Sequence, residues 1–129
     1  MKIKVLMAAM LGLITINAFA QKGELSTANE EYAKYDGLAN ANYALAKPSL
    51  DKAKASIDKA SANKKTADLP ETYALKAAIY ASIAAKDSVA ASSATETATA
   101  QEAIKKAEEL DTKKENTNLI LHAKRELAQ

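Results

Sequence analysis

Apolar residues recur every three or four positions over much of the chain, which is the spacing that keeps one face of an α-helix apolar. The first clear series after residue 20 is Leu25, Ala28, Tyr32, Tyr35, Ala39, Tyr43 and Ala46. The series runs past Gly37 without interruption, so it predicts one long helix that ends before Pro48. Lys47 precedes this proline and is therefore disfavoured in helical geometry.

The segment from Pro48 onward carries a second apolar stripe. Pro48 suits the first turn of a helix, where its missing N–H group has no intrahelical partner to lose. The stripe consists of Leu50, Ala53, Ile57 and Ala60, and a turn is expected at residues 63–66. Together the two stripes predict a first helix hairpin over about residues 24–62.

A third helix is expected over residues 69–86. Asp68 is placed to act as its N-cap, and Glu71 lies three residues further on, where its side chain can return a hydrogen bond to the cap. The residues that follow are apolar on most sides of the helix. This predicts neighbours on both flanks and makes it the most buried helix of the chain.

Residues 87–99 are rich in Ser, Thr and Ala, with few side chains large enough to bury useful area, so we expect a mobile loop there. Thr99 and Glu102 can form a capping box at the start of a fourth helix. The inward stripe of that helix is expected at Ala100, Ala103, Ile104, Ala107 and Leu110. It completes a second hairpin over about residues 69–111, and a terminal helix follows over about residues 116–128.

The second helices of the two hairpins share one spacing of small and branched side chains. The motif Ala53-x3-Ile57-x2-Ala60 recurs 47 residues later as Ala100-x3-Ile104-x2-Ala107. Small residues let two helices approach closely, and the bulkier neighbour fills the groove that remains. The chain is therefore expected to be all-α and built of antiparallel helix hairpins.

This pattern resembles the tetratricopeptide repeat, whose first helix carries W-x2-L-G-x2-Y and whose second carries A-x3-F-x2-A-x4-P. The likeness rests on Tyr73, Ala77, Tyr80, Ala100, Ile104, Ala107, Leu110 and Asp111. Lys76 stands where the family prefers leucine and Thr112 where it prefers proline, and the interval from Tyr80 to Ala100 is longer than in the family. The resemblance implies about two repeats in an α-α superhelix, with Tyr73 and Tyr80 packed between helices.

The resemblance also implies a function. Tetratricopeptide proteins bind peptide or protein segments along a face lined by the first helices of their hairpins, so the chain is expected to be an interaction scaffold and not an enzyme. Tyr35 and Tyr43 are the candidates for partner contact. The QKGEL opening, the AKPSLDKAKASIDKA stretch and the ELDTKKEN segment look like the N-terminal part of longer exported tetratricopeptide proteins of Gram-negative bacteria. The chain is interpreted as a short or truncated relative of these.

The first 20 residues have the form of a signal peptide. Lys2 and Lys4 precede an apolar run at residues 5–19, which is shorter than the about 20 residues needed to span a bilayer. The sequence Ala18-Phe19-Ala20 supplies small residues before a cleavage site. We therefore expect cleavage after Ala20, export to the periplasm, and no stable membrane insertion afterwards.

The charge balance and the chemistry of the side chains narrow the function further. Removal of residues 1–20 takes two of the 18 basic residues and none of the acidic ones, which leaves 16 of each. Nucleic-acid binding needs a basic surplus, so it is not expected. The chain has no cysteine, and His122 is its only histidine. No metal site, cofactor or acid–base pair is therefore indicated.

Two further interpretations stay open. The step of nearly 3.5 residues in the first helix also fits an envelope structural protein, or an amphipathic helical protein that lies on a lipid surface. In the terminal helix, the apolar face at Leu119, Ile120 and Leu121 has no following helix to cover it. Repeat arrays normally cover such a face, so self-association through the terminal helix or docking onto another protein is expected.

Overall fold

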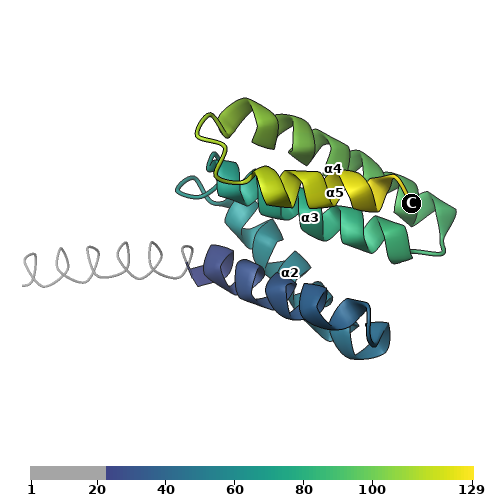
Figure 1. Ribbon diagram of the computed structural model, residues 1–129. Coiled ribbons are helices and arrows are strands. Elements are labelled where there is room, and N and C mark those ends of the chain that lie inside the picture. Colours follow the sequence, from purple (N-terminus) through teal and green to yellow (C-terminus); the bar gives the residue numbers. More distant parts are fainter. Residues whose placement is uncertain (1–22) are drawn as a thin grey trace, which may run out of the picture.

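The computed structural model describes residues 23–129, and the predicted signal peptide lies outside these residues. The described part consists of five helices joined by turns, without a strand (Figure 1). The helices are an N-terminal helix at residues 23–39, α2 (Tyr43–Ala62), α3 (Pro70–Lys86), α4 (Ala90–Leu110) and α5 (Thr117–Leu127). The all-α prediction is confirmed.

The chain reverses direction between the N-terminal helix and α2, so the prediction of one long helix up to Pro48 was wrong. Asn42 caps α2, because its side-chain oxygen accepts a hydrogen bond from the Leu45 N–H group at 3.2 Å. Pro48 consequently lies inside α2 and not at its start, and Lys47 is helical. Both antiparallel helices turn an apolar face to the same core, so the apolar spacing continues through the reversal.

The predicted stripe on α2 is confirmed, since the exposed fractions of Leu50, Ala53, Ile57 and Ala60 are all 1% or less. The turn that follows is held from inside by buried threonine hydroxyl groups. Thr66 donates to the Ala60 carbonyl oxygen at 2.5 Å, and Thr72 donates to the Thr66 carbonyl oxygen at 2.6 Å. These bonds satisfy buried polar atoms where the chain leaves α2.

The start of α3 differs from the predicted capping box at Asp68 and Glu71. Leu69 occupies the cap position and makes no side-chain cap bond, while Pro70 is the first helical residue. A proline fits there because its ring presets the helical φ angle and no intrahelical N–H bond is lost.

The helix α3 lies at the centre of the fold, as predicted for the most buried helix. It packs against α2, α4 and α5, and the hydroxyl groups of Tyr32 and Ser82 connect it to the N-terminal helix at 3.0 Å. Much of its surface is alanine, which allows neighbours to come close on several sides. Its buried residues are Thr72, Ala74, Leu75, Ala77, Ala78, Ile79, Ala81, Ser82 and Ala84.

The loop predicted at residues 87–99 is not present, because α4 already begins at Ala90. The first half of α4 contains Ser and Thr, which are weak helix formers. Their hydroxyl groups donate to backbone carbonyl oxygens, as Thr95 does to Ala91 at 3.2 Å and Thr99 does to Thr95 at 3.0 Å. Packing on α3 supplies the stability that their intrinsic propensity lacks. Thr99 and Glu102 therefore lie inside a helix, and the capping box predicted there was wrong.

The helix boundaries repeat with the same 47-residue spacing as the sequence motif. The N-terminal helix ends at residue 39, and α3 ends 47 residues later at Lys86. In the same way, α2 begins at Tyr43 and α4 begins at Ala90. The starts of α3 at Pro70 and of α5 at Thr117 form the third pair. The two copies of the motif are buried at equivalent positions, with Ile57 and Ile104 exposed by 0% and 8% and their four alanine neighbours by 0%. The interval from Tyr80 to Ala100 is thus filled by longer helices.

The last turn of α4 corrects one more prediction. Leu110, expected to face inward, is 36% exposed, whereas the next residue, Asp111, is 3% exposed. The Asp111 carboxylate accepts bonds from the backbone N–H groups of Glu115 and Asn116 and from the Asn116 side chain, at 3.1 to 3.2 Å. A buried carboxylate thereby organises the turn into α5.

Candidate functional site

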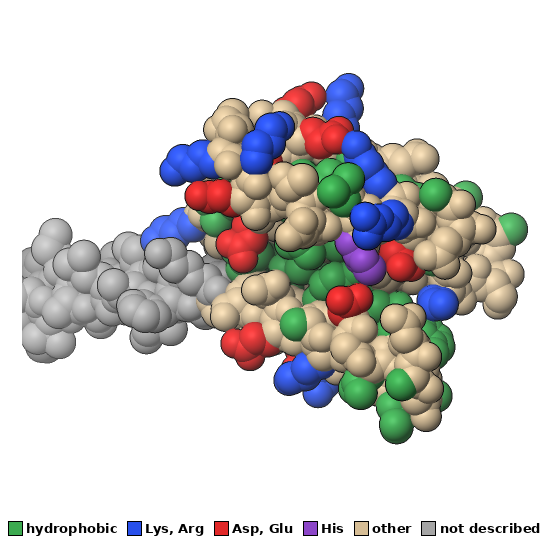
Figure 2. All heavy atoms as spheres, in the orientation of Figure 1, with side chains coloured by type: hydrophobic (Ala, Val, Ile, Leu, Met, Phe, Trp, Pro, Cys, Tyr) green, Lys and Arg blue, Asp and Glu red, His purple; other side chains and the backbone are tan. Residues whose placement is uncertain are grey.

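Two adjoining hollows lie between the N-terminal helix and α5, and we call them together the central groove. The larger, of about 330 Å³, is lined by Tyr32, Asp36, Asn118, Leu119, Leu121, His122 and Arg125. The smaller, of about 90 Å³, is lined by Tyr35, Asp36, Ala39, Asn40, Lys86, His122, Glu126 and Gln129. Asp36 and His122 belong to both. Figure 2 shows the histidine (purple) at the surface, with apolar side chains (green) beside it and charged side chains nearby.

The tyrosines of the N-terminal helix form the inner wall of the groove. The Tyr32 and Tyr35 rings lie 5.8 Å apart, and the side chains are only 4% and 3% exposed. Burial raises the pKa of Tyr32 above its ordinary value and that of Tyr35 to about 12. Both phenols are therefore neutral near pH 7 and act there as packing and hydrogen-bonding groups.

His122 connects the two sides of the groove. Its Nε2 atom lies 3.8 Å from a carboxylate oxygen of Asp36 on the N-terminal helix and 3.8 Å from one of Glu126 on α5. The edge of its ring meets Tyr32, with the ring centres 6.1 Å apart. The sequence alone predicted that His122 is an ordinary helix residue. Its place in the groove depends on a contact between the first and last helices that no local pattern reveals.

The two tyrosines predicted to contact a partner differ in exposure. Tyr35 is 3% exposed and lines the smaller hollow of the groove, so only a small part of its side chain is open to a partner in this conformation. Tyr43 is partly exposed at the start of α2, with its ring edge-on to Tyr35 at 6.5 Å and the Lys86 ammonium group 6.0 Å from its centre. A contact role for Tyr43 stays a prediction.

The residues predicted to pack between the repeats lie at helix contacts. Ala53, Ile57, Ala60, Ala77, Ala100, Ile104 and Ala107 are buried, while Tyr73 and Tyr80 are half-buried against the core. The Tyr80 hydroxyl group donates to Asp58 of α2 at 2.6 Å. Burial and this carboxylate raise the pKa of Tyr80. The Lys54 ammonium group lies 5.2 Å from its ring centre, so Tyr80 joins α3 to the surface of α2.

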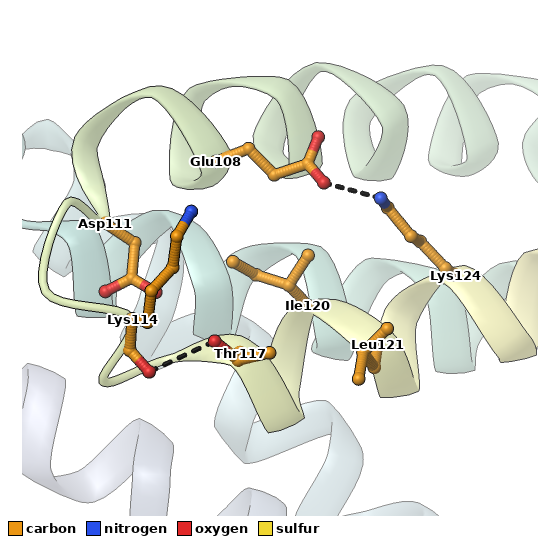
Figure 3. A pocket seen from close by; sticks show the side chains of 7 residues that line it. All are labelled: Glu108, Asp111, Lys114, Thr117, Ile120, Leu121 and Lys124. Carbon is orange, nitrogen blue, oxygen red and sulfur yellow. Dashed lines mark hydrogen bonds and ion pairs between the residues drawn. The ribbon is translucent and has the colours of Figure 1, made fainter.

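A third hollow of about 230 Å³ lies on the other side of α5, where this helix meets the end of α4 (Figure 3). Ile120 and Leu121 form its apolar wall, and Lys114 and Lys124 extend beside it. Lys124 forms an ion pair with Glu108. Leu121 also lines the larger hollow of the central groove, so its side chain lies between the two.

Metal and membrane features are absent from the described residues. Residues 23–129 contain no cluster of three or more His, Cys, Asp or Glu side chains suited to a metal ion. None of the helices in this range has the length and apolar character needed to cross a membrane.

Comparisons with family models, with curated proteins and with solved structures found no match to the chain.

Proposed function

We propose that the protein is an exported helical-repeat scaffold, similar in type to tetratricopeptide proteins, which binds a peptide or protein segment in the central groove. The observation that carries the proposal is the 47-residue repetition of helix boundaries, together with the burial of the same small and branched residues in α2 and α4. Stacked hairpins of this kind present a continuous face to a partner.

The location of the groove supports this proposal. The N-terminal helix and α5 occupy equivalent places as first helices of their repeats, and both line the groove. The larger hollow combines apolar groups, such as Leu119, with polar groups that converge from both sides, such as Asn118 and Arg125. Its volume of about 330 Å³ lies at the lower end of ligand pockets, which suits one or two side chains of a bound segment.

The alternative of a helix that lies on lipid is less well supported. A surface-active helix must leave its apolar face free for the membrane. Here Leu25, Ala28 and Tyr32 of the N-terminal helix are at most 7% exposed, because that face packs into the core.

The test is site-specific crosslinking in the envelope fraction of the source organism. A photoreactive amino acid at Asn118, an exposed residue of the groove, is expected to capture a discrete partner, whereas the same group at the exposed Lys52 of α2 captures none. Equal capture at both positions would contradict the proposed groove. Circular dichroism distinguishes the alternative, because a scaffold shows its full helix content without lipid and a surface-active protein gains helix when vesicles are added.

A further inference from the structure

The outward face of α5 presents an exposed leucine next to two hollows. Leu121 is 44% exposed and lines both the larger hollow of the central groove and the hollow beside α4. Figure 3 shows its side chain beside Ile120, on the wall of the second of these. A protruding leucine between two depressions is a suitable seat for a helix whose side chains enter both.

The repeat shows what occupies this place elsewhere in the molecule. With the 47-residue offset, Leu121, Lys124 and Arg125 of α5 and its C-cap residue Ala128 correspond to Ala74, Ala77, Ala78 and Ala81 of α3. All four alanines are 0% exposed, and α3 packs more extensively against its hairpin partner α4 than against α2 or α5. Within residues 23–129, α5 has no such partner helix.

The charges around Leu121 indicate which kind of helix would suit this place. Lys114 lines the hollow on one side of Leu121 and Arg125 lines the hollow on the other. Neither cation forms an ion pair within residues 23–129. Lys124 is neutralised by Glu108. Carboxylates line the same hollows, but Asp111 is bonded to backbone N–H groups and to the Asn116 side chain, and Asp36 lies 3.8 Å from His122. The two cations on either side of Leu121 are therefore complementary to an apolar residue flanked by carboxylates.

We propose that the outward face of α5, centred on Leu121 between Lys114 and Arg125, binds an acidic amphipathic helix of a partner protein. The helix lies on α5 as α4 lies on α3, with an apolar side chain against Leu121 and carboxylates at the two cations. This surface shares Leu121 and Arg125 with the larger hollow of the central groove and extends beyond it to Lys114.

The chain itself provides a matched pair of probes. Helix α4 carries four glutamates and two lysines, whereas α2 carries four lysines and two aspartates. Both contain the same stripe of small and branched residues, so synthetic capped peptides of residues 90–110 and 43–62 are similar helices of opposite net charge. Calorimetric titration of the purified protein is expected to give a dissociation constant at least about tenfold lower for the acidic peptide.

Three variants of the protein locate the binding. Reversal of both cations, Lys114→Glu with Arg125→Glu, is expected to weaken the acidic peptide about tenfold or more, and Leu121→Asp is expected to abolish binding. The matched control, Lys52→Glu with Lys64→Glu, makes the same change of net charge on exposed lysines of α2 and its following turn and leaves the affinity unchanged.

The outcomes distinguish binding at this surface from binding elsewhere on the molecule. Equal affinity for the two peptides would overturn the proposal. Binding of the acidic peptide that survives Leu121→Asp would also overturn it, because the peptide would then have replaced α4 on α3. A dimer of the protein alone that Leu121→Asp dissociates would make a second copy the occupant and also overturn it. Asn40→Ala lies in the smaller hollow of the central groove, which neither Leu121 nor Arg125 lines, and leaves peptide binding unchanged, so an effect of this variant on partner capture concerns the groove proposal alone.

Discussion

The first hairpin, formed by the N-terminal helix and α2, and the second, formed by α3 and α4, share their spacing but are filled differently. Tyr32 and Tyr35 in the first correspond, 47 residues later, to Ile79 and Ser82 in the second. All four are buried, and the large rings of one helix pack beside the small residues of the other. The arrangement of helices therefore tolerates exchange of volume between neighbours, provided that the small residues at the closest approaches are kept.

The largest expected effect separates the two copies of the motif. Ile57→Ala removes a side chain that is 0% exposed and should lower the free energy of unfolding by about 3 kcal/mol, while Ile104→Ala, at 8% exposure, should cost about 2 kcal/mol. Chemical denaturation measures both, with the exposed Lys52→Ala as a control. A negligible effect at either isoleucine would show that this copy of the motif is not part of the core.

The small residues of the motif give the next effect. Ala53→Leu and Ala100→Leu insert bulk where neighbouring helices meet, and each should cost about 1 to 3 kcal/mol of stability. Ala55→Leu on the exposed side of α2 should change stability by less than about 0.5 kcal/mol. If one of the buried alanines accepts leucine without loss, the two hairpins do not pack alike.

A smaller effect concerns the contact between the hairpins. Tyr32→Phe leaves the buried Ser82 hydroxyl group without its 3.0 Å partner and should cost about 1 kcal/mol. Combining it with Ser82→Ala should cost less than the sum of the single changes, because the second change removes the unsatisfied group. Strict additivity in this double-mutant cycle would mean that the two hydroxyl groups do not interact.

The same tyrosines make the first hairpin sensitive to alkali. In the unfolded chain a phenol titrates near pH 10, while in the fold the pKa of Tyr35 is raised to about 12 and that of Tyr32 is also raised. The unfolded chain thus loses protons first, and stability falls as the pH rises above about 10. Denaturation midpoints between pH 8 and 11 should show this fall, and Tyr35→Phe should reduce it. A flat profile would contradict the burial of the phenols.

The smallest expected effect compares the two turns that follow α2 and α4. Lys114, in the second, has a φ angle of 60°, and it is the one residue other than glycine with positive φ in the described part. Lys114→Gly removes the steric cost and should stabilise the protein by about 0.5 to 1 kcal/mol, whereas Lys113→Gly should not. A loss of stability in Lys114→Gly would show that the Lys114 side chain stabilises the fold by more than the positive φ angle of its backbone destabilises it.

The existence of the helices could be predicted from apolar spacing, but two boundaries could not. The spacing is the same on both sides of residues 40–42, because both helices face one core, so only the cap residue Asn42 marked the reversal. Residues 90–99 lack large apolar side chains, and packing on α3 overrides their weak propensity. Once α2 is known to begin at Tyr43, the 47-residue offset places the start of α4 at Ala90.

The site was less accessible from sequence than the fold. The tyrosine stripe was visible, but periodicity does not tell whether a ring faces solvent or a neighbouring helix, and Tyr35 faces the core. The groove itself forms between residues 32–40 and 118–129, which both pack on α3 and contact each other at His122. Contacts so distant in the sequence leave no local signal, as the position of His122 illustrates.

Amide hydrogen exchange over the first half of α4 tests the equivalence of the two hairpins most directly. If α4 begins at Ala90, as the 47-residue repeat requires, the amide hydrogens of residues 94–99 are protected to a degree similar to those of residues 49–52 in α2. Exchange of residues 94–99 at the rate of an unfolded chain, with residues 49–52 protected, would contradict the repeat and the scaffold built on it.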